Sequence, residues 1–122
     1  MIEFGNSSHV GLRRELNEDT YYSDSELGLW LVADGMGGHE FGEVASALAR
    51  DAVVREIRAG RSLSEAIRSA DEDIIRQSKR RDDSLPMGTT VVALQVTDHH
   101  FELAWVGDSR AYLWNGQLRQ IS

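Results

Sequence analysis

The sequence predicts an α+β fold in which helices cover one face of an antiparallel sheet. Its patterns come in blocks: strands first, then two long helices over about 40–59 and 63–81, then strands again. Segregated blocks of this kind favour an antiparallel sheet with helices on one side. The pair Asn115-Gly116 follows an apolar run near the end of the chain and predicts a β-hairpin there.

The composition limits the class of protein. A chain of 122 residues is long enough for one small domain, and we expect a single domain over 1–122. The 20 acidic and 13 basic residues give a net charge of -7, which argues against nucleic-acid binding. The chain has no cysteine, so disulfides and thiolate metal sites are excluded. No apolar run resembles a signal peptide or a membrane span, so we expect a cytoplasmic protein without a membrane partner.

The first part of the chain predicts short strands. Residues 2–8 alternate weakly between apolar and polar, which indicates a short edge strand, and 9–19 form a loop. Residues 20–23 are rich in β-formers and predict a strand that ends in a turn at 24–26. The nearly continuous apolar run over 27–33 is typical of a strand buried on both faces.

Two amphipathic helices follow a glycine-rich loop. Apolar residues at helical spacing predict the first helix over about 40–59, and Gly60 stands where a C-terminal cap glycine belongs. The run Ser62-Leu63-Ser64-Glu65 matches a capping box and opens the second helix over about 63–81.

The last part of the chain predicts antiparallel strands joined by turns. Residues 88–96 and 101–106 read as strands on either side of a turn at 97–100. A tight turn at 107–109 leads to a further strand over 110–114, which enters the hairpin.

Acidic residues occur where strands begin or end. Asp34 follows one apolar run, Asp108 follows another, and Glu18-Asp19 stands just before a strand. Carboxylates that come together repel one another, and a divalent cation removes that conflict. Oxygen ligands without cysteine favour Mg²⁺ or Mn²⁺ over Zn²⁺. Gly35 has no side chain, so its carbonyl can approach an ion closely.

Each of these features has a simpler interpretation when it stands alone. Asp34 before a glycine is most often a turn residue, and Asp108 can cap its own turn. Arg14 can be a solvated loop residue, and His39 can lie at the start of a helix. Only their combination indicates a site.

Five motifs together resemble the metal-dependent Ser/Thr protein phosphatases of the PP2C (PPM) family in their bacterial form. They occur at 14–19 (Arg-Glu-Leu-Asn-Glu-Asp), 32–39 (Val-Ala-Asp-Gly-Met-Gly-Gly-His), 42–46 (Gly-Glu-Val-Ala-Ser), 88–90 (Gly-Thr-Thr) and 106–112 (Val-Gly-Asp-Ser-Arg-Ala-Tyr). The resemblance spans almost the whole chain in the family's order. It implies an α-β-β-α sandwich, of which this chain would form the N-terminal half and lack the C-terminal portion.

The resemblance also implies a role for each acid. Asp34 would bridge two Mn²⁺ or Mg²⁺ ions, and the Gly35 carbonyl would complete the ligands of one ion. Glu18 and Asp19 would hold metal-bound waters. Asp108 would help to bind a third, weaker ion.

The implied reaction is hydrolysis of phosphoserine and phosphothreonine on proteins. A water activated by two metal ions would attack phosphorus in line, and no phosphoenzyme would form. Arg14 would bind the substrate phosphate with its guanidinium fork. His39 would donate a proton or order a water. The implied partners are phosphorylated proteins that a Ser/Thr kinase of the same cell has modified.

The family's catalytic domain is longer than this chain and carries two further aspartates late in its sequence. We therefore expect an incomplete domain with little activity of its own and an exposed apolar sheet face, which could drive self-association. The alternatives are a non-catalytic phosphatase-like binding module or regulatory fragment, and a structural domain that binds a cation.

Overall fold

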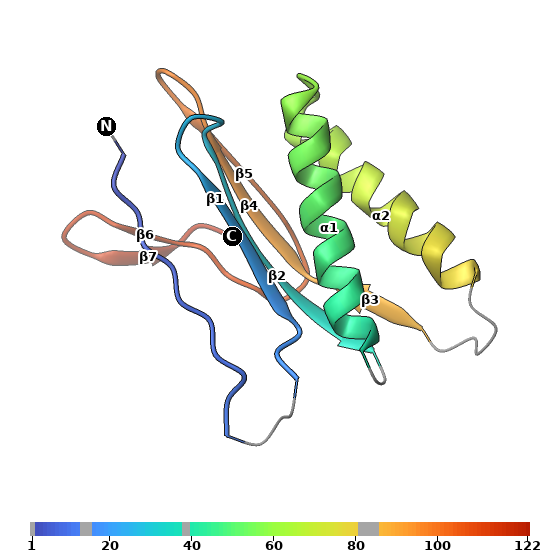
Figure 1. Ribbon diagram of the computed structural model, residues 1–122. Coiled ribbons are helices and arrows are strands. Elements are labelled where there is room, and N and C mark those ends of the chain that lie inside the picture. The colour runs from blue at the N-terminus through green and yellow to red at the C-terminus, as the bar shows by residue number, and fades with distance from the viewer. Residues whose placement is uncertain (1, 13–15, 38–39, 81–85) are drawn as a thin grey trace.

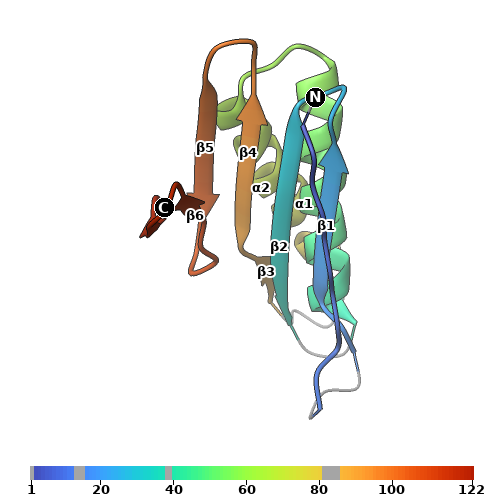
Figure 2. The same cartoon turned by 90° about the vertical axis from the view of Figure 1, so that its left-hand side faces the viewer.

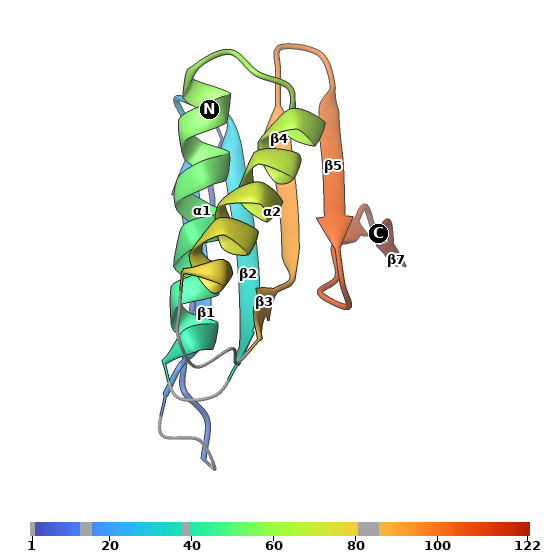
Figure 3. The ribbon, with the colours of Figure 1, turned by 90° about the vertical axis from the view of Figure 1, so that its right-hand side faces the viewer.

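The computed structural model describes residues 2–12, 16–37, 40–80 and 86–122, and it has helices on one face of an antiparallel sheet (Figure 1). The elements are β1 (Asp19–Asp24), β2 (Leu29–Gly37), α1 (Phe41–Arg58), α2 (Leu63–Lys79), β3 (Met87–Thr89), β4 (Val91–Val96), β5 (Phe101–Val106), β6 (Tyr112–Trp114) and β7 (Leu118–Gln120). Both helices lie on the same side of the sheet (Figure 3). The predicted α+β fold is confirmed.

The main sheet has five strands. Its order is β1-β2-β4-β5, and β3 pairs with the C-terminal end of β2, at residues 35–37. All these pairings are antiparallel, and the four longer strands lie side by side in Figure 2. Strands β6 and β7 form a separate two-stranded sheet, which confirms the hairpin predicted from Asn115-Gly116. This hairpin and the N-terminal segment lie on the side of the sheet away from the helices (Figure 1).

The hydrophobic core lies between the sheet and the helices. Leu29, Leu31 and Ala33 of β2 point toward the helices and are almost fully buried. Helix α1 meets them with the small buried side chains of Ala45, Ala49, Ala52 and Val53. Because alanine adds little bulk, α1 can lie close to β2, and this packing fixes where the start of the helix meets the strand.

The expectation that the apolar run over 27–33 is buried on both faces is wrong. Strand β2 covers Leu29–Gly37 and alternates between buried and exposed residues, and Val32 is 48% exposed. The helices cover one face only. The other face borders a cavity of about 880 Å³ that the N-terminal segment and the β6–β7 hairpin also line. There the Phe4 ring packs edge-on against Trp30, with the ring centroids 6.0 Å apart.

Three further strand predictions need correction. Residues 2–8 form no strand, because they pair with no neighbouring backbone. The strand expected over 88–96 is divided at Thr90 into β3 and β4. The strand expected over 110–114 begins at Tyr112, where pairing with β7 begins.

The ends of the helices follow the sequence signals. Gly60 adopts φ of +82°, its N–H donates to the Ile57 carbonyl at 3.0 Å, and the Arg61 N–H donates to Glu56 at 3.0 Å. These two bonds form a Schellman motif, so the predicted cap is confirmed. The Ser62 hydroxyl accepts from the Glu65 N–H at 3.1 Å, as the capping box predicts. Residue 81, where the second helix was expected to end, lies outside the described residues.

We expect Ser62→Ala to lower the free energy of unfolding by about 1 kcal/mol, because the Glu65 N–H loses its acceptor. Ser64→Ala is the matched control, since Ser64 is an exposed serine in the same helical turn. Thermal unfolding followed by circular dichroism measures both variants. Equal midpoints for the two variants would contradict a capping role for Ser62.

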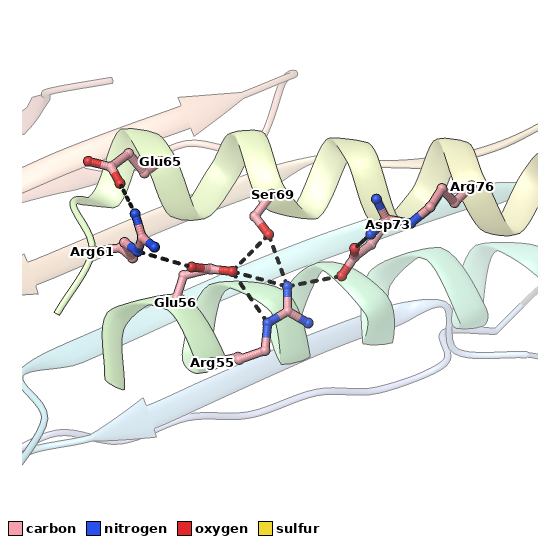
Figure 4. Close-up of polar contacts among 7 residues, drawn as sticks. All are labelled: Arg55, Glu56, Arg61, Glu65, Ser69, Asp73 and Arg76. Carbon is pink, nitrogen blue, oxygen red and sulfur yellow. Dashed lines mark hydrogen bonds and ion pairs between the residues drawn. The ribbon is translucent and has the colours of Figure 1, made fainter. Parts of the chain in front are cut away.

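A network of polar side chains joins α1 to α2 (Figure 4). Arg55 of α1 donates to Ser69 at 2.9 Å and to Asp73 at 3.2 Å, both on α2. The hydrogen bond to Asp73 raises the pKa of Arg55. Arg55 is 54% exposed, and ion pairs that reach the surface contribute little stability, so the network adds only a small share to the packing of α1 on α2. In the ranges that the structure describes, no helix combines the length and apolarity needed to cross a bilayer.

Candidate metal centre

Two carboxylates face each other across β1 and β2. Asp34 lies directly opposite Asp19, and both side chains are exposed. The Asp34 backbone N–H and C=O both bond toward Thr90 on the other side of β2. Asp19 and Asp34 are therefore a non-hydrogen-bonded pair, the kind in which side chains lie closest, with Cβ atoms about 5 Å apart.

The carboxylate pair suits a hard divalent cation. Like charges directly opposite each other destabilise a sheet, and a cation near both, held directly or through a bound water, offsets this cost. Carboxylate oxygens are also the ligands that Mg²⁺ and Mn²⁺ prefer. Within the ranges described here, no three His, Cys, Asp or Glu side chains gather into a metal-holding group. In that part of the chain, the Asp19–Asp34 pair is the feature that fits a cation.

Close packing of the backbone requires a glycine at residue 35. A Cβ atom there would lie 1.9 Å from the Gly42 carbonyl oxygen and 2.9 Å from the Glu18 carbonyl oxygen. The Gly35 N–H donates to the same Glu18 oxygen at 3.1 Å. Only glycine therefore lets β2 pass this close to the first turn of α1. The sequence argument considered the Gly35 carbonyl and missed this packing reason.

Glu18 lies on the helix side of the sheet. A Cβ atom on Gly42 would be 2.5 Å from the Glu18 carboxyl carbon, so this carboxylate rests against the first turn of α1. Negative charge is favourable at that end of a helix. Neighbouring residues in an extended chain point to opposite faces, and Asp19 accordingly shares the face of Asp34 while Glu18 does not. A water-holding role for Glu18 and Asp19 stays a prediction.

Asp108 lies toward the same end of the sheet as Asp34. Strands β2 and β5 both run antiparallel to β4, so the residues that follow them emerge at one end. Asp108 is exposed and follows Gly107, which adopts φ of +100°. A hydrogen bond to Tyr112 raises the pKa of the neighbouring Arg110, and the charge of Asp108 raises it further. The Asp108 carboxylate therefore already has a cationic neighbour.

Two predicted site residues, Arg14 and His39, lie outside the described residues.

The residue whose role sequence reasoning missed is Thr90, which bonds the backbone of Asp34 and the side chain of Ser109. Thr90 belongs to the motif at 88–90, but threonine is common in strands, so nothing in the sequence indicated a role of its own for this residue. Its importance depends on a pairing between residues 34 and 90.

The comparisons with known proteins agree with this architecture. The family model described as Protein phosphatase 2C matches residues 8–122. The serine/threonine protein phosphatase PstP of Mycobacterium tuberculosis is 36% identical over all of this chain, and the serine/threonine phosphatase stp of Listeria monocytogenes is 33% identical over 92% of it. A crystal structure of the PstP catalytic domain in complex with two manganese ions superimposes with a TM-score of 0.85 at 36% identity. That superposition covers 95% of this chain and 53% of the PstP chain.

The fold is thus that of one part of a bacterial phosphatase catalytic domain. The chain belongs to the protein phosphatase 2C family. It spans 25% of the length of PstP and 50% of the length of stp.

Proposed function

We propose that the protein carrying this chain hydrolyses phosphoserine and phosphothreonine on other proteins with Mn²⁺ or Mg²⁺ as cofactor. The observation that carries this proposal is the facing pair Asp19 and Asp34 on the exposed face of the sheet. Membership of the protein phosphatase 2C family supports it. So does the PstP catalytic domain, whose solved structure contains two manganese ions.

The proposed roles are those that the family resemblance implies for each residue. Asp34 would be the anionic ligand shared by the two ions, and the Gly35 carbonyl would add a neutral oxygen. Asp19, which faces Asp34, and Glu18, which lies on the helix side of the sheet, would hold metal-bound waters. Asp108 helps to hold a third ion. The bound ions supply a water that is nucleophilic near neutral pH. Because Asp34 lies within a paired strand, its carboxylate is presented from a rigid backbone, which favours a fixed geometry.

The roles proposed for Arg14 and His39 rest on the sequence motifs alone. Arg14 binds the phosphoryl oxygens, since a guanidinium matches two of them at once. His39 donates a proton to the leaving oxygen or orders a water. The substrates are phosphoproteins modified by a Ser/Thr kinase, and the cytoplasm is the proposed compartment. Self-association through the apolar sheet face also stays a proposal.

The proposal is tested by phosphate release from a phosphothreonine peptide. We expect the protein carrying this chain to release phosphate with Mn²⁺, to stop after chelation with EDTA, and to recover when Mn²⁺ is restored. Binding of the phosphopeptide without phosphate release, at any Mn²⁺ or Mg²⁺ concentration, would instead support the phosphatase-like binding module. The same assay on residues 1–122 alone tests the expectation that this stretch has little activity by itself.

A further inference from the structure

The strand pairing is irregular at Asp34. The register of β2 with β4 and β3 pairs Val32 with Val92 and Gly35 with Thr89, which places Asp34 opposite Thr90. Two residues in a regular hydrogen-bonded pair exchange both of their backbone N–H···O bonds. One such bond is present, because the Thr90 N–H donates to the Asp34 carbonyl at 2.9 Å.

A side chain replaces the second bond. The Asp34 N–H donates to the Thr90 hydroxyl oxygen at 3.1 Å rather than to the Thr90 carbonyl. That carbonyl accepts instead from the Thr89 hydroxyl at 2.8 Å. The substitution of a side chain for a backbone acceptor explains why the strand predicted over 88–96 is divided at this residue.

The same hydroxyl reaches the loop that carries Asp108. The Thr90 and Ser109 hydroxyl oxygens are 2.7 Å apart. A hydroxyl has one donor and two acceptor sites, so Thr90 can accept from Asp34 and bond Ser109 at once. Thr90 is only 5% exposed, and little water can compete for these bonds.

The methyl branch of Thr90 contacts the loop as well. A Cβ atom on Gly107 would lie 2.6 Å from the Thr90 methyl carbon, so the backbone of this glycine packs directly against it. Thr90 therefore meets the loop on both sides of Asp108, through its methyl at Gly107 and through its hydroxyl at Ser109.

We propose that Thr90 is a positioning residue that joins the two acidic positions of the metal centre. Its hydroxyl fixes the backbone of Asp34 relative to the Asp108 loop, so both carboxylates are held in place before a cation binds. Side chains that orient metal ligands typically contribute to affinity without touching the metal. The inference deepens the proposed function, on which the identity of the cation rests.

Two substitutions of Thr90 separate the effect of its hydroxyl on metal binding from the effect of its methyl. Thr90→Val keeps the branched shape and removes the hydroxyl, whereas Thr90→Ser keeps the hydroxyl and removes the methyl. In the protein carrying this chain, we expect Thr90→Val to weaken Mn²⁺ binding about tenfold in calorimetry. We expect Thr90→Ser to bind Mn²⁺ like the wild type, even where its thermal midpoint is lower.

Amide hydrogen exchange without metal gives a second reading. We expect the Asp34 amide to exchange faster in Thr90→Val than in Thr90→Ser, while the exchange rate of the Leu31 amide in the same strand is unchanged.

Wild-type Mn²⁺ affinity in Thr90→Val, or equal weakening of Mn²⁺ binding in both variants, would overturn the proposal. A wild type that binds no Mn²⁺ would overturn it too. A wild type that binds Mn²⁺ and releases no phosphate would overturn only the proposed function.

Discussion

Replacing Asp34 with asparagine is expected to lower phosphate release by the protein carrying this chain about a thousandfold, because the metal ions lose their shared anionic ligand. A metal ion stabilises the transition state of such a hydrolysis by several kcal/mol. Each 1.36 kcal/mol of barrier height changes the rate by about a factor of ten. Asparagine has nearly the shape of aspartate and keeps one oxygen. The loss therefore reports on charge and bridging rather than on packing.

The measurements for Asp34→Asn are kcat, Mn²⁺ affinity and the thermal midpoint of the metal-free protein. Because Asp34 is exposed and Asp34→Asn removes the repulsion with the facing Asp19, we expect the metal-free midpoint to stay the same or rise slightly. Asp71→Asn is the matched control, since it removes an exposed carboxylate from α2, away from the sheet. Activity of Asp34→Asn close to that of this control would show that Asp34 is not a metal ligand, and the two-metal mechanism would fail with it.

The variant also distinguishes the two main functions. An enzyme that depends on Asp34 loses turnover when the carboxylate is removed. A binding module that uses another surface keeps its partner in Asp34→Asn with the same affinity. Retained binding with no phosphate release by the wild type would favour the module.

The helices could be predicted well from the sequence because their signals are local. The Ser62 cap, the Gly60 C-terminal signal and the apolar spacing within each helix depend on residues within one or two turns. The helix expected over about 40–59 is Phe41–Arg58 in the structure. Nothing distant in the chain had to be known to place these ends.

The site could be predicted only in part because it depends on pairing between distant residues. Glycine is uncommon in strands, so 35–38 read as a loop, yet pairing with β3 extends β2 to Gly37. The meeting of Asp19 with Asp34 follows from the register of β1 and β2, which no short motif specifies. The role of Thr90 requires a contact across 56 positions. The ends of the apolar runs supplied the candidate acids, the resemblance to a family supplied their roles, and the register shows that Asp19 and Asp34 share a face.

Gly35→Ala is expected to cost about 3 kcal/mol of stability, because the added methyl has no room. Its Cβ would lie 1.9 Å from the Gly42 carbonyl oxygen and 2.9 Å from that of Glu18. Both are backbone atoms, so no change of rotamer relieves the overlap. The strand and the first turn of α1 must move apart, and this movement also disturbs the backbone that carries Asp34.

Gly88→Ala is the matched control for this substitution. Gly88 lies in β3 opposite Met36, and its Cβ would meet the Met36 side chain at an ordinary 3.6 Å. Both changes reduce the freedom of the unfolded chain equally, so their difference isolates the overlap at residue 35. Equal stability of the two variants would show that β2 and α1 separate easily. If Gly35→Ala then lost Mn²⁺ binding without losing stability, the glycine would be required for access of its carbonyl to the ion, and close packing would not explain it.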